Sequence, residues 1–339
     1  MSSPLVRATA DQPSSWGALR LARVRYRFEA LQPLRLPTYK GSTFRGALGK
    51  ALKRTLCLRH RLPSCDGCHL MEACRYPDLF ETRFSPRRNG RHPIPTPPFV
   101  LIPPDTPETD FETGRQLDCG LVLIGDALAD APSFNRAFAE IGRLGLGRGR
   151  AKCRLTQIDT LSPRDATPSD APHTGPAGNR SDDLPNRPGG IIQFTAEQII
   201  RDRSDWMQSR RWKMDFLTPT RLQNRGRLVE DPDFPVLMQR LCERVETLSR
   251  LYASDLRFDV EAILEEASRT RLIDSQIRWD DWERYSNRQQ TRMRLGGFRG
   301  TATYEGNLSF FTPLLALGEW LNVGKGATFG LGRFQVHPL

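Results

Sequence analysis

The chain has 339 residues and a formal net charge of +11, from 50 Lys and Arg against 39 Asp and Glu. This length allows two domains with separate cores, and the positive excess favours nucleic acid over an anionic membrane surface as the partner. No apolar run approaches the about 18 residues of a membrane span, and the N-terminal stretch has charged and proline breaks where a signal peptide is apolar. We therefore expect a cytoplasmic protein with no membrane partner.

The first predicted elements are a strand and a helix. From Leu19 to Phe28 apolar residues alternate with arginines, which predicts a half-buried strand whose open face is basic and meets RNA or water. From Ser42 to Leu56 apolar residues recur at helical spacing, with cations on the other side, which predicts an amphipathic helix.

Four cysteines follow that helix with the spacing C-x7-C-x2-C-x5-C: Cys57, Cys65, Cys68 and Cys74. Four thiolates can close a tetrahedral zinc site, which would be structural because it leaves no position for water. The spacing does not match ferredoxin-type iron–sulfur runs. Other metals or clusters, and reduced thiols without a ligand, are the alternatives. Cys119, Cys153 and Cys242 are expected to be small core residues.

The middle of the chain alternates loops with regular elements. Residues 85–98 are rich in Pro and Arg and are expected to be a loop that lines an RNA path or is simply solvated. The apolar runs PFVLIPP and CGLVLIG predict two strands, and a helix is predicted from Ser133 to Leu144. Residues 159–189 are rich in Pro, Gly, Ser and Asp and are expected to be a flexible linker.

In the second half, GIIQFTA and FLTPTRLQ predict strand segments, a strong helix is predicted from Pro232 to Tyr252, and a long basic strand from Met293 to Tyr304. Trp279, Trp282 and Tyr285 could stack on bases, but packing in a core or groove is the preferred interpretation.

The closing stretch GEWLNVGKGATFGLGRFQV concentrates glycines and two cations: Gly324, Gly326, Gly330 and Gly332, with Lys325 and Arg333. Successive N–H groups in a glycine-rich turn form a concavity that suits an anion, and the cations favour the same ligand. Phosphate is the first candidate, and a glycine-rich hairpin turn without a ligand is the alternative. The spacing is not that of nucleotide-binding loops, which disfavours an NTP or a dinucleotide.

A weaker copy of this pattern lies in LGLGRGRAKCRL, residues 144–155. Each copy has a helix, a glycine loop and an alternating strand, which indicates two similar domains. Arg148 and Arg150 lie in the first glycine loop and join the candidate RNA contacts.

Four segments carry a family resemblance: GSTFRGAL with the cysteine array, FLTP, MRLGGFRGTATYEG and the closing glycine motif. Over nearly its whole length outside the linker, the chain resembles the CRISPR-associated Cas six endoribonucleases of the RAMP superfamily. The resemblance implies an α+β fold of tandem ferredoxin-like (RRM-like) βαββαβ domains at 18–158 and 190–339. It also implies a C-terminal glycine-rich loop and a small cysteine-rich, zinc-type insertion at 57–74.

The resemblance further implies a metal-independent endoribonuclease that binds CRISPR repeat RNA and cleaves precursor CRISPR RNA within repeats. Attack by the 2′-hydroxyl would leave 2′,3′-cyclic phosphate and 5′-hydroxyl ends, and would need a base, an acid and cations. One alternative is a non-catalytic CRISPR RNA-binding subunit of an effector complex, with other complex subunits as partners. A zinc-stabilised nucleic-acid-binding protein outside CRISPR systems is another.

Catalytic groups in the family include a His near the first helix, with Tyr or Lys nearby. Here His60 follows that helix, and an ordinary histidine pKa of about 6.5 suits a general acid, although His60 could instead only cap the metal loop. Tyr39, Lys40 and Lys50 flank the same helix as further candidates, although contact with RNA or solvent is the preferred interpretation for each. Related sequences often have His where this chain has Asn322, and because Asn cannot transfer a proton, this difference favours the binding-only alternative.

Overall fold

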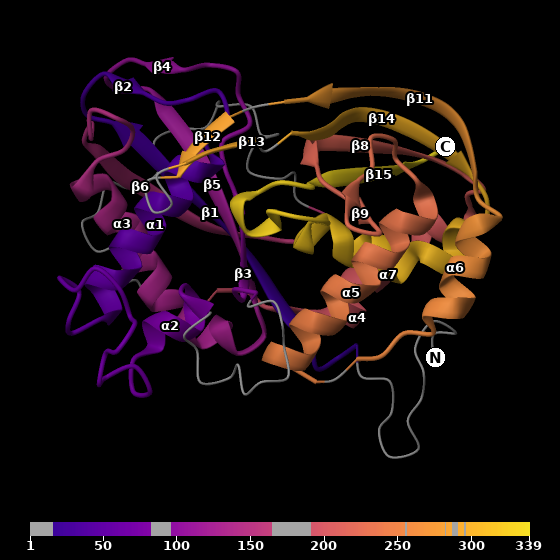
Figure 1. Ribbon diagram of the computed structural model, residues 1–339, viewed down its shortest axis with the longest axis horizontal. Helices are drawn as coiled ribbons and strands as arrows, with labels where there is room; N and C mark the ends of the chain where they lie inside the picture. Colours follow the sequence, from indigo (N-terminus) through magenta and orange to yellow (C-terminus); the bar gives the residue numbers. More distant parts are fainter. Residues whose placement is uncertain are drawn as a thin grey trace. The chain divides into compact units, whose positions relative to one another are not determined.

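The computed structural model describes residues 16–82, 96–164, 191–254, 256–281, 283–286, 291–294 and 296–339, with the backbone alone at 283–286 and 291–294. These residues form a mixed α+β structure with antiparallel sheets, which confirms the predicted class (Figure 1). The chain divides into two compact units, residues 21–193 and residues 1–20 with 194–339. Most of the predicted Pro/Arg-rich loop and of the predicted linker lies outside the described residues.

The first unit runs strand, helix, two strands, helix, strand. Its strands form an antiparallel sheet in the order β3, β5, β1, β6. The elements are β1 (Arg20–Ala30), α1 (Gly41–Leu56), β3 (Phe99–Ile102), β5 (Gln116–Ile124), α3 (Ala131–Leu144) and β6 (Cys153–Leu161). Shorter elements are β2 (Leu34–Arg35), α2 (Arg75–Leu79), β4 (Asp110–Phe111) and a 3₁₀ turn, η3 (Gly125–Asp130). The predicted helices and strands of this half are therefore confirmed.

Apolar side chains from this sheet and from α1 and α3 form one core. The ring of Tyr26 on β1 stacks on that of Phe138 on α3, with centroids 3.6 Å apart. Cys119 and Cys153 are buried in this core, and Cys242 is buried in the second unit, as predicted for the three isolated cysteines.

The prediction that β1 has a basic face open to RNA or water is wrong. Arg23 and Arg27 are only 3% and 8% exposed. Arg27 forms a two-pronged ion pair with Asp118 of β5, and Arg25 pairs with Asp159 of β6. In the sheet register each of these arginines lies directly opposite its carboxylate. Two of the cations of β1, Arg25 and Arg27, are consequently neutralised within the sheet.

The second unit repeats the arrangement of the first. Its main sheet has the order β11, β14, β8, β15. When the four strands of each main sheet are numbered 1 to 4 along the chain, both sheets have the order 2-3-1-4. The elements are β8 (Arg211–Thr220), α5 (Phe234–Tyr252), α6 (Val260–Ser268), β11 (Arg271–Asp280), β14 (Gly297–Glu305), α7 (Leu308–Leu321) and β15 (Phe334–Pro338). Shorter elements are β7 (Phe194–Thr195), α4 (Ala196–Arg201), η5 (Ser204–Gln208), β9 (Gln223–Asn224), β10 (Arg227–Leu228), β12 (Glu283–Ser286), β13 (Thr291–Arg294) and η6 (Ala327–Phe329).

The helix predicted from Pro232 to Tyr252 is confirmed as α5, which begins two residues later because Asp233 caps it by accepting the N–H of Val236 at 2.9 Å. The strand predicted from Met293 to Tyr304 is divided between β13 and β14.

Sequence patterns did not indicate α6 or β11. Trp279 on β11 is 40% exposed rather than in the core, and the side chains of Trp282 and Tyr285 lie outside the described residues.

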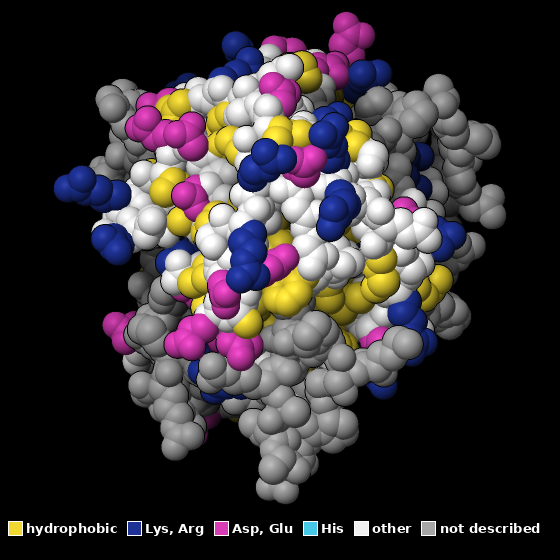
Figure 2. Space-filling model, turned by 90° about the vertical axis from the view of Figure 1, so that its right-hand side faces the viewer, with side chains coloured by type: hydrophobic (Ala, Val, Ile, Leu, Met, Phe, Trp, Pro, Cys, Tyr) yellow, Lys and Arg dark blue, Asp and Glu magenta, His cyan; other side chains and the backbone are white. Residues whose placement is uncertain are grey.

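Charge is mixed on the face drawn in Figure 2, where Lys and Arg side chains lie among Asp and Glu. Among the described helices, none combines the length and the apolar composition that a bilayer span requires.

Candidate functional site

The C-terminal glycine turn connects α7 to β15 and requires its glycines. Gly324, Gly326, Gly330 and Gly332 all have positive φ. A Cβ at Gly332 would lie 1.8 Å from the carbonyl oxygen of Val323, and a Cβ at Gly324 would lie 2.5 Å from that of Arg221. These glycines therefore allow close backbone contacts that other residues would prevent.

Most N–H groups of this turn already bind protein oxygens. Four such donor–acceptor pairs are Val323 N–H to Gly332 O at 2.9 Å, Lys325 N–H to Arg221 O at 3.0 Å, Gly332 N–H to Pro219 O at 3.1 Å and Arg333 N–H to Thr218 Oγ1 at 2.9 Å. The predicted concavity of successive free N–H groups is not formed by these donors. The turn is instead a rigid structure that holds the Lys325 side chain on the surface, while Arg333 is only 2% exposed.

Asn322 closes α7 and is part of the same turn. It has a φ of 56° and is 1% exposed, and its side-chain amide donates to the carbonyl of Leu331 at 3.1 Å. Its ψ of 172° places it outside the αL region that asparagine tolerates, so this backbone conformation is strained and is held by the surrounding contacts. Asn322 thus has a clear structural role at the position where relatives were expected to carry a catalytic group.

The glycine turn of the first unit connects α3 to β6 in the same way. Leu146 and Ala151 exchange two N–H to carbonyl bonds, each 2.9 Å long, and Gly145 and Gly147 have positive φ. The two candidate RNA contacts of this turn, Arg148 and Arg150, are exposed. The helix–glycine turn–strand repeat predicted from the sequence is confirmed in both units.

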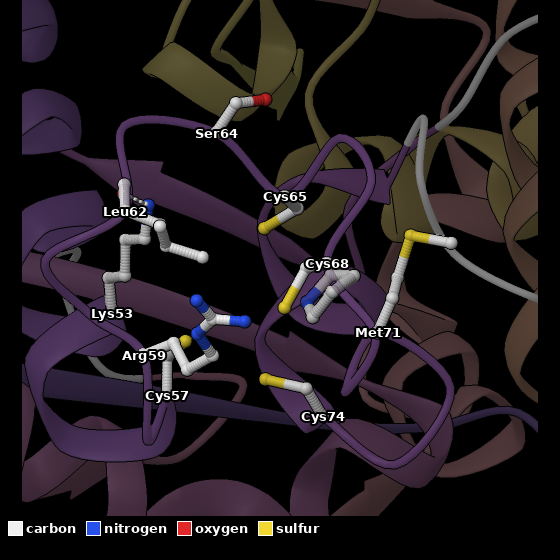
Figure 3. A pocket seen from close by; sticks show the side chains of 10 residues that line it. Lys53, Cys57, Arg59, Leu62, Ser64, Cys65, Cys68, Met71 and Cys74 are labelled. Atoms are coloured by element: carbon white, nitrogen blue, oxygen red, sulfur yellow. Dashed lines mark hydrogen bonds between the residues drawn. The ribbon is translucent and has the colours of Figure 1, made fainter.

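The cysteine array lies after α1 and surrounds one pocket. Cys57, Cys65, Cys68 and Cys74 all line it, and Figure 3 shows the sulfurs of Cys65, Cys68 and Cys74 directed toward the same space. The N–H of Cys68 donates to the carbonyl of Cys65 at 3.2 Å, which forms the tight C-x2-C turn. Lys53 and Arg59 also line the pocket.

Burial raises the pKa of the Cys65 thiol to about 11; Lys53 opposes this shift, while Glu81 and the thiols of Cys57 and Cys74 add to it. Four cysteine sulfurs are nevertheless a donor set that suits zinc. However, among the described residues no group of three or more His, Cys, Asp and Glu side chains is arranged so that it could hold a metal ion.

Three of the candidate catalytic residues, Tyr39, Lys50 and His60, are not brought together. Tyr39 precedes α1 and His60 follows it, and a helix of 16 residues is roughly 24 Å long, so the two residues lie at opposite ends of α1. Burial raises the pKa of the Tyr39 phenol, which keeps its proton. His60 and Lys50 are exposed.

Lys40 was expected to contact RNA or solvent, and this interpretation is wrong because the residue is buried. Its side chain is fully buried, and its ammonium donates to the carbonyls of Thr38 at 3.0 Å and Thr106 at 2.7 Å. Burial lowers its pKa, against the opposing effect of Asp105 and Glu108. Through the hydrogen bond to Thr106, Lys40 links the start of α1 to the loop before β4.

Comparison with known proteins relates the second half of the chain to a known family. Residues 214–334, from β8 to the start of β15 and including the C-terminal glycine turn, match the model of the CRISPR-associated endoribonuclease Cas6. Residues 19–173 match a second model, described as an N-terminal domain.

Solved Cas6 structures share the fold of this chain. A Cas6 product complex has a TM-score of 0.55 and 17% identity, covering 94% of this chain and 100% of that one. Cas6 of Thermus thermophilus has a TM-score of 0.52 and 15% identity, covering 94% and 99%. A partial Cas6-RT-Cas1–Cas2 complex has a TM-score of 0.58 and 11% identity, covering 95% and 46%. An uncharacterized protein of Archaeoglobus fulgidus is 25% identical over 325 residues, 94% of this chain and 98% of its own length.

Proposed function

We propose that this chain is a metal-independent endoribonuclease of the Cas6 family that binds CRISPR repeat RNA and cleaves precursor CRISPR RNA within its repeats. The main support is the family match, which spans the second sheet together with its glycine turn. The shared 2-3-1-4 strand order supports tandem ferredoxin-like (RRM-like) domains. Because β6 extends to Leu161, the first domain continues past the expected limit of 158 and the linker begins after β6 rather than at 159. Such sheets and their loops are a common platform for RNA.

The RNA backbone would contact exposed cations on the two glycine turns. Arg148, Arg150 and Lys325 are exposed on turns whose backbone is fixed by hydrogen bonds. Cations held on rigid turns suit phosphate oxygens, which position the RNA without reading its sequence. The turn glycines would set the backbone path that presents these cations to the RNA. The buried Arg333 would stabilise the turn from its inner side.

Cleavage would use the 2′-hydroxyl of the RNA as the nucleophile. A base takes its proton, the oxygen attacks the adjacent phosphorus, and an acid protonates the departing 5′-oxygen, so the ends are a 2′,3′-cyclic phosphate and a 5′-hydroxyl. We assign proton donation to His60, which is exposed to a substrate. Tyr39, at the other end of α1 and protonated, could contact RNA only as a hydrogen-bond donor, and Lys50 only as a cation.

The test is incubation of the full chain with repeat RNA from its own genome in EDTA, with the RNA ends identified. We expect cleavage without a divalent metal. His60→Ala should lower the single-turnover rate by about 10² to 10⁴ with unchanged RNA affinity, whereas His69→Ala, the matched change in the same segment, should not. Equal rates for the two variants would contradict the assignment of His60, and intact RNA despite tight binding would contradict the catalytic proposal.

A second candidate is a non-catalytic RNA-binding subunit of a CRISPR effector complex. Asn322 favours it, because this side chain binds the Leu331 carbonyl and cannot transfer a proton. It requires repeat RNA to be bound intact and to be recovered with other CRISPR proteins. A nucleic-acid-binding protein outside CRISPR systems would bind unrelated RNA of equal length equally well.

We also propose that Cys57, Cys65, Cys68 and Cys74 hold one structural zinc ion, which would draw the four thiols closer together. A bound zinc ion would fix the segment between α1 and α2 and take no part in cleavage. Metal analysis of the full chain should give about one equivalent of zinc, lost in Cys68→Ser but kept in Cys119→Ala. Less than about half an equivalent in the unchanged chain would contradict a stable site.

A further inference from the structure

Among the described strands, β11 pairs with β14 alone and is an edge strand of the second sheet (Figure 1). Eight of its ten residues are exposed, and the remaining two, Ile277 and Asp280, are partly exposed. Its other edge therefore presents backbone N–H and carbonyl groups to solvent, and such an edge is a template for pairing with another strand.

Two charged side chains of β11 lack partners within the described part of the chain. Asp274 and Arg278 are exposed, and neither forms a hydrogen bond or ion pair with a described residue. Arg278 lies directly opposite Arg299 of β14 in the register. Like charges opposite each other in a sheet are unfavourable, so a carboxylate on the free side of Arg278 would be stabilising.

Hydrogen-bond geometry restricts how two copies of this edge could pair. Along a strand, backbone groups point alternately toward one neighbour and the other, and facing residues of an antiparallel pair must point the same way. In a two-fold pairing of β11 with itself, each residue therefore faces one an even number of positions away. The two-fold axis must then pass between the two copies of one residue, which is the centre of the pairing. The possible centres that lie within two positions of Gln276 are residues 274 to 278.

Only the centre at Gln276 pairs opposite charges. In that register Asp274 faces Arg278 of the second copy, and Arg278 faces Asp274, so the contact forms twice. A centre at Ser275 places Asp274 opposite Gln276, and a centre at Ile277 places Asp274 opposite Asp280, which is repulsive.

Apolar side chains match in the same register. Ile273 and Trp279, which are 44% and 40% exposed, would face each other at both ends of the paired segment. Ile273 is the extra residue of a bulge in the β11–β14 ladder. Because a bulge bends the strand and disrupts the ladder, it limits the pairing to the segment around Gln276.

We propose that β11 is a self-association surface, at which the β11 strands of two copies of this chain pair antiparallel about Gln276. The second sheets of the two copies then form one continuous sheet. A two-fold contact uses the same surface on both partners and closes on itself, so it forms a dimer rather than a fibre. One strand pair buries less than the about 1,200 Å² of stable interfaces, so the dimer should depend on protein concentration.

The experiment is sedimentation of the full chain, free of RNA, over a range of concentrations, with charge reversals at the two positions. Asp274→Arg places Arg opposite Arg and Arg278→Asp places Asp opposite Asp, so each should weaken the dimer at least about tenfold, the size of a 1.4 kcal/mol change. The double variant D274R/R278D restores both opposite-charge pairs and should restore the dimer. Arg201→Asp, an exposed change on α4, is the matched control.

A chain that stays monomeric at all concentrations would overturn the proposal. So would a dimer that neither single reversal weakens, or one that the double reversal fails to restore. If the single reversals change RNA affinity and leave the dimer intact, the edge serves RNA and the proposal is wrong. Thermal melting of each variant separates loss of association from loss of folding.

Discussion

The Arg27–Asp118 pair combines burial with full hydrogen bonding. Arg27 Nε and Nη2 donate to the two carboxylate oxygens at 2.8 and 2.9 Å, and the side chains are 10% and 2% exposed. Hydrogen bonding to Asp118 raises the pKa of Arg27 despite its burial. Such a buried pair adds little to the free energy of unfolding, but removing one partner leaves a buried charge without compensation, which is strongly destabilising.

Replacing Asp118 by Asn should therefore destabilise the chain by about 3 kcal/mol or more, because Arg27 stays charged. Asp159→Asn removes the partner of Arg25, whose pair is 18% and 27% exposed, and should cost about 1 kcal/mol or less. Urea unfolding measures both changes. Equal costs for the two variants would contradict the assignment of a buried pair.

Lys40 predicts a pH dependence of stability. Burial lowers its folded pKa below the ordinary 10.5, so in the interval between the folded and unfolded pKa the unfolded chain binds more protons. Stability then rises with pH in that interval, and below it the cost of burying the charge is constant. Lys40→Met lacks this titration. The difference in unfolding free energy between the natural chain and Lys40→Met should increase between pH 7 and pH 10.5, and a constant difference would contradict it.

At the scale of elements, in both units the helix that precedes the last strand packs on that strand at a glycine. A Cβ at Gly142 of α3 would meet the carbonyl oxygen of Cys153, the first residue of β6, and a Cβ at Gly318 of α7 would meet the ring of Phe334, the first residue of β15. The same placement of the glycine in both units indicates that the duplication includes the packing of helix on strand and not only the glycine turn that follows.

Gly142→Ala should be strongly destabilising, by about 2 kcal/mol or more, because its Cβ would lie 2.3 Å from a backbone oxygen. Gly318→Ala should cost less, because its contacts are with side chains that can move. Gly46→Ala is the control, since in α1 its Cβ meets nothing within 4 Å, and it should stabilise the chain by about 1 kcal/mol. Thermal melting would rank the three variants by stability. If Gly142→Ala did not change the melting temperature, the close approach of Gly142 to the Cys153 carbonyl would be contradicted.

The sequence predicted the elements with a clear period and missed those without one. Helices α1, α3 and α5 have apolar stripes and were found nearly to the residue. Strand β11 has no buried face, so its pattern carries no alternation. The basic face of β1 was wrong because Asp118 and Asp159, which neutralise it, are far away in the sequence. At the glycine turn, some N–H groups that were expected to be free, such as that of Gly332, bind distant carbonyls, here that of Pro219.

At the scale of the whole molecule, the net charge of +11 is the excess of 50 Lys and Arg over 39 Asp and Glu, to which ion pairs add nothing. Arginines in ion pairs, such as Arg201 with Glu197 at 2.6 Å, add little to the attraction of RNA. The exposed cations of the glycine turns remain available to phosphates. The affinity for the proposed RNA should therefore fall strongly as the salt concentration rises, but only some of the cations should contact phosphates.

Each phosphate contact with single-stranded RNA contributes about 0.7 to the slope of log affinity against log salt. Lys325→Ala should therefore lower the slope by about 0.7, and R148A/R150A should lower it by about 1.4. Arg201→Ala should leave it unchanged, because that cation is already paired. RNA titrations between 50 and 200 mM salt would measure the slopes. If all three variants lower the slope equally, binding follows net charge alone and the glycine turns are not its contact sites.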